Sequence, residues 1–105
     1  MDEHSDFDAA FRIPDWIPAD DRVRLDVSEL ADLDDELAQA CRELGDRLGA
    51  HVAAYRPGAR ARPTGLCSLF RYAVLDDANA RLLGDAERER HGIILVAYAR
   101  PLQRW

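Results

Sequence analysis

The sequence predicts an α+β domain with the ferredoxin-like, or split βαβ, order of elements (βαββαβ). The hydrophobic period carries this prediction, because along the chain it changes from two to a helical period and back. The segments are 22–27 (strand), 28–48 (helix), 51–55 and 67–75 (strands), a shorter helical stretch, and 93–99 (strand). We therefore expect a four-stranded antiparallel sheet in the order 4-1-3-2, with both helices on one face and an N-terminal tail before the first strand.

Residues 28–48 carry the clearest helical pattern in the chain. Ser28 is suited to the N-cap, and Gly49 is suited to end the helix in the left-handed conformation. The apolar positions recur at steps of three and four, so they form one stripe along the helix. They are Leu30, Leu33, Leu37, Cys41, Leu44 and Leu48.

A second, shorter helix is expected before the last strand. Either Asp76 or Asp77 could cap its N-terminus. Gly84 interrupts the helical pattern, so the helix either stops at Leu83 or continues weakly to Arg90.

Length and charge bound the class of protein. A chain of 105 residues can build one hydrophobic core, and no apolar run approaches the roughly 20 residues that cross a bilayer. Residues 1–47 hold 15 acidic and 5 basic groups, whereas 48–105 hold 5 acidic and 9 basic groups, and every basic residue is arginine. The net charge of −6 disfavours non-specific binding to nucleic acid. The acidic N-terminal sequence does not read as a presequence, so a cytoplasmic location is expected.

We divide the chain into an acidic-aromatic N-terminal tail, residues 1–20, and a single α+β domain, residues 21–105. The tail combines acidic groups with two prolines and widely spaced apolar residues. Such a segment either packs into a groove of its own domain or docks on a partner, and packing on its own domain is the interpretation that we favour. The apolar residues concerned are Phe7, Phe11, Ile13, Trp16 and Ile17.

The positions of the arginines predict which face each strand turns away from the helices. An unpaired guanidinium is costly to bury. We therefore assign the two faces of each strand so that Arg71 and Arg100 point into water. The residues turned toward the helices are then Phe70, Tyr72, Val74, Val52, Ala54, Ile93, Leu95, Ala97 and Ala99.

The opposite face is expected to be open, and it gathers arginine and tyrosine. This mixture is typical of protein interfaces. It is also the composition with which sheets stack nucleic-acid bases. An alternative remains, in which the tail covers this face with Trp16 and Phe11. The candidate partner-binding residues are Arg24, Tyr55, Arg71, Tyr98 and Arg100 on the sheet, with Trp16 from the tail.

A second candidate site is the loop of residues 56–65, which is rich in proline, glycine and arginine. Forked guanidinium donors and free backbone N–H groups could bind a phosphate there. The alternative is a solvated hairpin loop whose arginines are attracted to the nearby carboxylates of Asp26, Glu29 and Asp32. The candidate anion-binding residues are Arg56, Arg60, Arg62 and Thr64.

The sequence gives little support to catalysis or metal binding. The two cysteines and three histidines show no zinc-ligand spacing, and the chain contains no P-loop, GxGxxG or HExxH motif. Residues 65–74 do not match the aromatic motif of RNA-recognition domains, and we recognise no particular family in the sequence. We expect neither a cofactor nor a metal, and no membrane partner.

We therefore predict a small, non-catalytic binding or regulatory module. Its partner is expected to be another protein or a second copy of the chain, bound by the open sheet face or by the tail. Two alternatives remain. One is binding of nucleic acid or a phosphate ligand by residues 56–65, and the other is a dimeric α+β-barrel enzyme whose two sheets enclose a small-molecule cavity.

Overall fold

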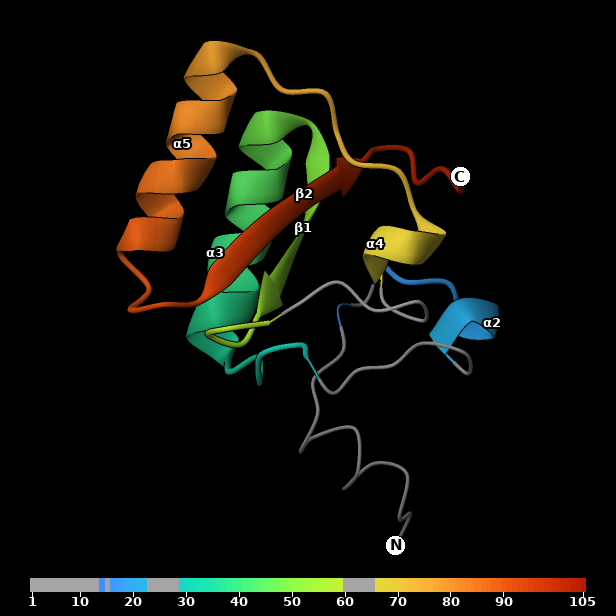
Figure 1. Ribbon diagram of the computed structural model, residues 1–105, viewed down its shortest axis with the longest axis horizontal. Coiled ribbons are helices and arrows are strands. Elements are labelled where there is room, and N and C mark those ends of the chain that lie inside the picture. Colours follow the sequence, from blue (N-terminus) through green and yellow to red (C-terminus); the bar gives the residue numbers. More distant parts are fainter. Residues whose placement is uncertain (1–13, 15, 23–28, 60–65) are drawn as a thin grey trace, which may run out of the picture.

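A two-stranded antiparallel sheet lies at the centre of the structure, with the long helices on one side of it and short helices on the other (Figure 1). The computed structural model describes residues 14, 16–22, 29–59 and 66–105. The elements are α2 (Ala19–Arg22), α3 (Asp35–Leu48), β1 (Ala50–Tyr55), α4 (Leu66–Leu69), α5 (Asp77–Arg88) and β2 (Ile94–Ala99).

The strands β1 and β2 are apolar along almost their whole length and are covered on both faces. Their register pairs Ala50 with Ala99 and Tyr55 with Ile94. A central strand that is buried on both faces reads as a continuous apolar run rather than as an alternation. Both strands were expected from the sequence, as 51–55 and 93–99, and both predictions are confirmed.

The predicted ferredoxin-like sheet is wrong, and only the general α+β class is confirmed. The order 4-1-3-2 would place residues 51–55 and 93–99 at opposite edges of a four-stranded sheet. In the structure these two segments are direct neighbours. Of the other two expected strands, 22–27 lies outside the described residues except for Arg22, which ends the helix α2, and 67–75 is not a strand.

The segment expected as the third strand begins with a helical turn, α4, and continues with isolated bridges only. Arg71 shows why no regular ladder forms. Its N–H donates to the carbonyl of Gln103 at 2.8 Å, while its own carbonyl accepts from the N–H of Ala99 at 2.9 Å. Between these two partners, residues 100–102 leave the line of the strand, and Pro101 among them has no N–H to donate.

Helix α3 begins later than the sequence suggests. Its N-cap is Asp34, whose carboxylate accepts the N–H of Leu37 at 2.8 Å. The expected N-cap, Ser28, lies outside the described residues, and residues 29–34 before the helix are not helical. The expected C-cap is confirmed, because Gly49 adopts the left-handed conformation with φ 64°.

Helix α5 is capped by Asp76, whose carboxylate accepts the N–H of Asn79 at 2.8 Å. Gly84 does not end the helix, which runs on to Arg88. No residue of α5 is fully buried, although its apolar side packs against the sheet through partly buried side chains. Among the described residues, no helix has the length and apolar character needed to cross a membrane.

The sheet separates two hydrophobic clusters. The first lies between the strands and the helices α3 and α5, which Figure 1 shows on the same side of β1 and β2. The second lies on the opposite face of the sheet. Its buried members are Ile17, Leu30, Ala53, Phe70 and Tyr98.

Candidate functional site

All three tyrosines and both tryptophans of the chain lie in one connected cluster beside β1 and β2. Trp16 lies against Tyr98 with ring centroids 6.0 Å apart, and Tyr98 stacks on Tyr72 at 5.7 Å. Trp105 meets Tyr72 edge to face at 6.2 Å. The hydroxyl of Tyr55 lies 2.5 Å from that of Tyr98. We call these five side chains the aromatic row.

The expected orientation of β1 and β2 is confirmed. Val52, Ala54, Leu95 and Ala97 belong to the cluster under the helices. Tyr98, with Tyr55 and Val96 packed beside it, belongs to the opposite cluster.

The expected orientation of residues 69–74 is wrong. Phe70 is buried in the cluster opposite the helices, whereas Ala73 packs on the helix side. Arg71 was used to set the phase, but at the edge of a sheet a long guanidinium side chain reaches water from either face. Its position therefore carries no information about the phase there.

The sheet face expected to be open is covered by the protein itself. Tyr98 is 0% exposed and Phe70 is 1% exposed. Ile17 from the N-terminal segment is buried with them, and Trp16 stacks on His51 with ring centroids 4.8 Å apart. Cover by the tail, the alternative named above, therefore holds for Trp16, while Phe11 lies outside the described residues.

The tyrosines inside the row resist ionisation. Burial raises the pKa of Tyr55 to about 12, although the hydrogen bond with Tyr98 opposes the rise. Burial and the same hydrogen bond together raise the pKa of Tyr98. The phenols of this face are therefore held neutral and do not serve as bases near neutral pH.

The protein should become easier to unfold as the pH rises above about 10. The Tyr55 phenol loses its proton near 10.0 in an ordinary environment and near 12 in the folded protein. Above pH 10 the unfolded chain therefore binds fewer protons than the native one, and the free energy of unfolding falls. After discounting for solvent screening, we expect a loss on the order of 1–2 kcal/mol by pH 12. Urea unfolding across this range measures it.

A Tyr55→Phe variant is the control for this pH dependence. Its free energy of unfolding should change less between pH 10 and 12, because the shifted phenol is gone. Identical slopes for the two proteins would show that Tyr55 does not carry the effect.

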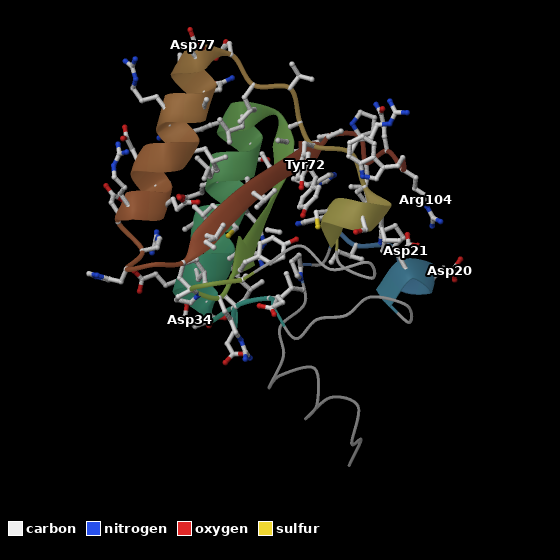
Figure 2. All side chains as sticks on the ribbon, in the orientation of Figure 1. Asp20, Asp21, Asp34, Tyr72, Asp77 and Arg104 are labelled. Atoms are coloured by element: carbon white, nitrogen blue, oxygen red, sulfur yellow. The ribbon has the colours of Figure 1, made fainter. Side chains whose placement is uncertain are left out.

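A buried carboxylate fixes the C-terminal segment against the N-terminal one. Asp21 in α2 is 2% exposed. The guanidinium of Arg104 donates to both of its oxygens, at 2.6 and 2.7 Å. Figure 2 shows the two side chains on the same side of the molecule, next to α4. This pair sets the position of the last residues of the chain and, with them, of Trp105.

The aromatic row ends at the surface. The exposed fractions are 48% for Tyr72, 64% for Trp105 and 101% for Val74, and these are the large exposed apolar side chains of the described residues. Arg71 lies over the Trp105 ring, with its guanidinium carbon 5.9 Å from the centroid. The indole N–H of Trp105 donates to the carbonyl of Cys67 at 3.0 Å, which orients the ring. We call Arg71, Tyr72, Val74 and Trp105 the edge patch.

The residues that the sequence nominated for partner binding are spread over different environments. Tyr98 is fully buried, and Tyr55 and Trp16 are half-buried. Arg100 pairs with Asp46 of α3 at 3.0 Å. Arg71 is exposed in the edge patch, and Arg24 lies outside the described residues.

The proposed anion loop is described only at its beginning. Arg56 donates through Nε to the carbonyl of Leu30 at 3.1 Å and lies 3.6 Å from Asp32. This arginine therefore makes internal contacts, as the solvated-loop alternative expected. The other nominated residues, Arg60, Arg62 and Thr64, lie outside the described part of the chain.

A cavity of about 320 Å³ lies beside Trp16 and α3. Cys41 and His51 both line it. Burial raises the pKa of the Cys41 thiol, which opposes formation of the nucleophilic thiolate. Within the described residues, no three histidine, cysteine or acidic side chains converge as metal ligands would.

Comparison with known proteins does not indicate the functional class of this protein, which has to be argued from the geometry. No family model, no curated protein and no solved structure matches the chain.

Proposed function

We propose that this protein is a non-catalytic binding module, and that it contacts another protein through the edge patch. The observation that carries the proposal is the contact of two exposed aromatic rings, Tyr72 and Trp105, with Arg71 over the Trp105 ring. Val74, which is also exposed, follows two residues after Tyr72. Exposed apolar patches with polar surroundings mark interaction sites on soluble proteins. Tryptophan, tyrosine and arginine also supply most of the binding energy at protein interfaces.

A protein partner fits this surface better than nucleic acid does. The chain carries a net charge of −6, so it gains nothing from general attraction to phosphates. Arg56, the described arginine of the nominated loop, is held by Leu30 and Asp32.

The dimeric barrel alternative receives no support from the sheet. Such a dimer packs two sheets face to face. Here that face is already occupied by Ile17, Leu30 and Phe70 of the same chain.

Site-specific photocrosslinking from Val74 tests the proposal. Val74 is fully exposed, so a benzoylphenylalanine there should not disturb the fold. In cells, we expect this probe to form a defined crosslink to one partner, and the same probe at Arg88 on α5 to form none. Arg88 is a matched control because its side chain is also largely exposed.

Substitution of the patch should abolish that crosslink. An Arg71→Ala/Trp105→Ala double variant should bind the partner at least roughly 30-fold more weakly, since each residue is of a type that dominates interfaces. Its urea unfolding should stay close to that of the parent, because both side chains are exposed. Crosslinking that persists in the folded double variant, or that arises only from Arg88, would contradict the proposal.

A further inference from the structure

The β1–β2 sheet is flanked by two extended segments, and the first of these edges is closed. The N–H of Ala31 donates to the carbonyl of Ala54 at 3.0 Å, which places residues 29–31 beside β1. Leu30, in the middle, turns its carbonyl away from β1. There the carbonyl accepts a hydrogen bond from Nε of Arg56 at 3.1 Å, and Leu30 is only 7% exposed.

The second edge, beside β2, has no such cap among the residues that the structure describes. The N–H of Ala73 donates to the carbonyl of Ala97 at 3.0 Å, and the carbonyl of Arg71 accepts from Ala99 at 2.9 Å. Because peptide groups alternate along an extended chain, the N–H and carbonyl of Tyr72 point outward. No described residue bonds to either group, and Tyr72 is 48% exposed.

We propose that this edge at Tyr72 accepts an extended segment of another protein as an added strand. The inference rests on the proposed function and names the chemistry of its partner. An exposed edge offers a ready row of backbone donors and acceptors. In strand addition these groups supply affinity, and alternate side chains supply specificity. Within the described residues, the edge at Leu30 is capped by a side-chain donor and the edge at Tyr72 is not.

The side chains around the edge indicate an acidic and apolar partner segment. Tyr72 and Trp105 offer an exposed aromatic surface for apolar side chains. Arg71 makes no ion pair with any residue in the described part of the chain, although its Nε donates to the carbonyl of Arg104. An acidic side chain on the added strand would pair with this guanidinium.

A second copy of the chain is a poor occupant of the same edge. Symmetric pairing about Tyr72 would place Arg71 opposite Ala73 of the other copy. The two Arg71 side chains would then be diagonal neighbours on one face, within about 8 Å. Like charges at that separation disfavour pairing, and residues 71–74 contain no acidic group to compensate.

Short synthetic peptides that alternate aspartate with valine or phenylalanine are the probe. We expect the acidic peptide to bind and to slow hydrogen exchange of the Tyr72 amide at least about tenfold, because that N–H becomes hydrogen-bonded. One matched control carries N-methyl groups on the pairing edge and should bind at least about tenfold more weakly. In the other control peptide, lysine replaces aspartate, and the protein should prefer the aspartate peptide over this one. This preference should disappear in the Arg71→Gln variant of the protein.

The outcomes separate this inference from the proposed function. Equal binding of the parent and N-methylated peptides, or a Tyr72 amide that still exchanges freely in the complex, would overturn strand addition and leave contact through the edge patch standing. Failure of the acidic peptide to bind, or protection of Tyr72 that grows with protein concentration alone, would also overturn it. The proposed function fails independently if the Val74 probe captures no partner.

Discussion

Replacing Tyr98 with alanine should lower the free energy of unfolding by about 3–5 kcal/mol, the range for large aromatic side chains in a core. Tyr98 is 0% exposed and lies against both Trp16 and Tyr72. The substitution removes the centre of the aromatic row and leaves the Tyr55 hydroxyl without its hydrogen-bond partner. Urea unfolding followed by circular dichroism measures the change.

A Tyr98→Phe variant isolates the hydroxyl from the ring. It keeps the packing and loses only the hydrogen bond to Tyr55, so it should cost about 1 kcal/mol. A Tyr98→Ala variant as stable as Tyr98→Phe would show that the row does not hold the covered face together.

Replacing Arg104 with alanine should lower the free energy of unfolding by about 2–3 kcal/mol, below the usual cost of breaking a buried pair because Arg104 itself is half exposed. The cost arises at Asp21, whose carboxylate is 3% exposed and loses both of its close contacts to this guanidinium. Thermal or urea unfolding detects the loss.

The matched control restores the charge balance at the buried end. In an Asp21→Asn/Arg104→Ala double variant no charge is left unpaired, so it should be more stable than Arg104→Ala alone. A double variant that is less stable than the single one would mean that Asp21 does not depend on Arg104.

The sequence predicted which side chains of β1 and β2 face the helices, but it did not predict which strands pair with each other. Alternation of side chains states which residues share a face. It does not state which strand lies alongside. Val52 and Leu95 were therefore assigned to the correct face within a sheet of the wrong order.

The start of α3 was misplaced because two leucines continue the helical spacing into a segment that is not helical. Leu30 and Leu33 are both buried, but they enter different clusters on opposite faces of the sheet. The spacing of these two leucines therefore matches a helix only because each is buried in a different cluster, and not because the segment is helical. The acidic N-cap at Asp34 was the local signal that marks the true start.

The edge patch was only partly accessible to sequence reasoning. Arg71 was nominated as a contact residue, while Tyr72 and Val74 were assigned to the core because Arg71 set the phase of the segment. Trp105 lies beyond the last strand, where no periodicity applies. Its position depends on the pairing of Arg104 with Asp21, a contact between residues far apart in the sequence.

A partner that binds the edge patch should leave the covered face of the sheet intact. Acrylamide quenching of tryptophan fluorescence in single-tryptophan variants tests this. The partner used is the protein identified by photocrosslinking from Val74. Trp16→Phe leaves Trp105 as the reporter. Trp105→Phe leaves Trp16, and because this variant lacks one contact of the edge patch, it is measured at a partner concentration at which its complex is shown to be saturated. Bound partner should shield Trp105 and leave the quenching of Trp16 unchanged. Exposure or shielding of Trp16, with Trp105 unaffected, would contradict this expectation.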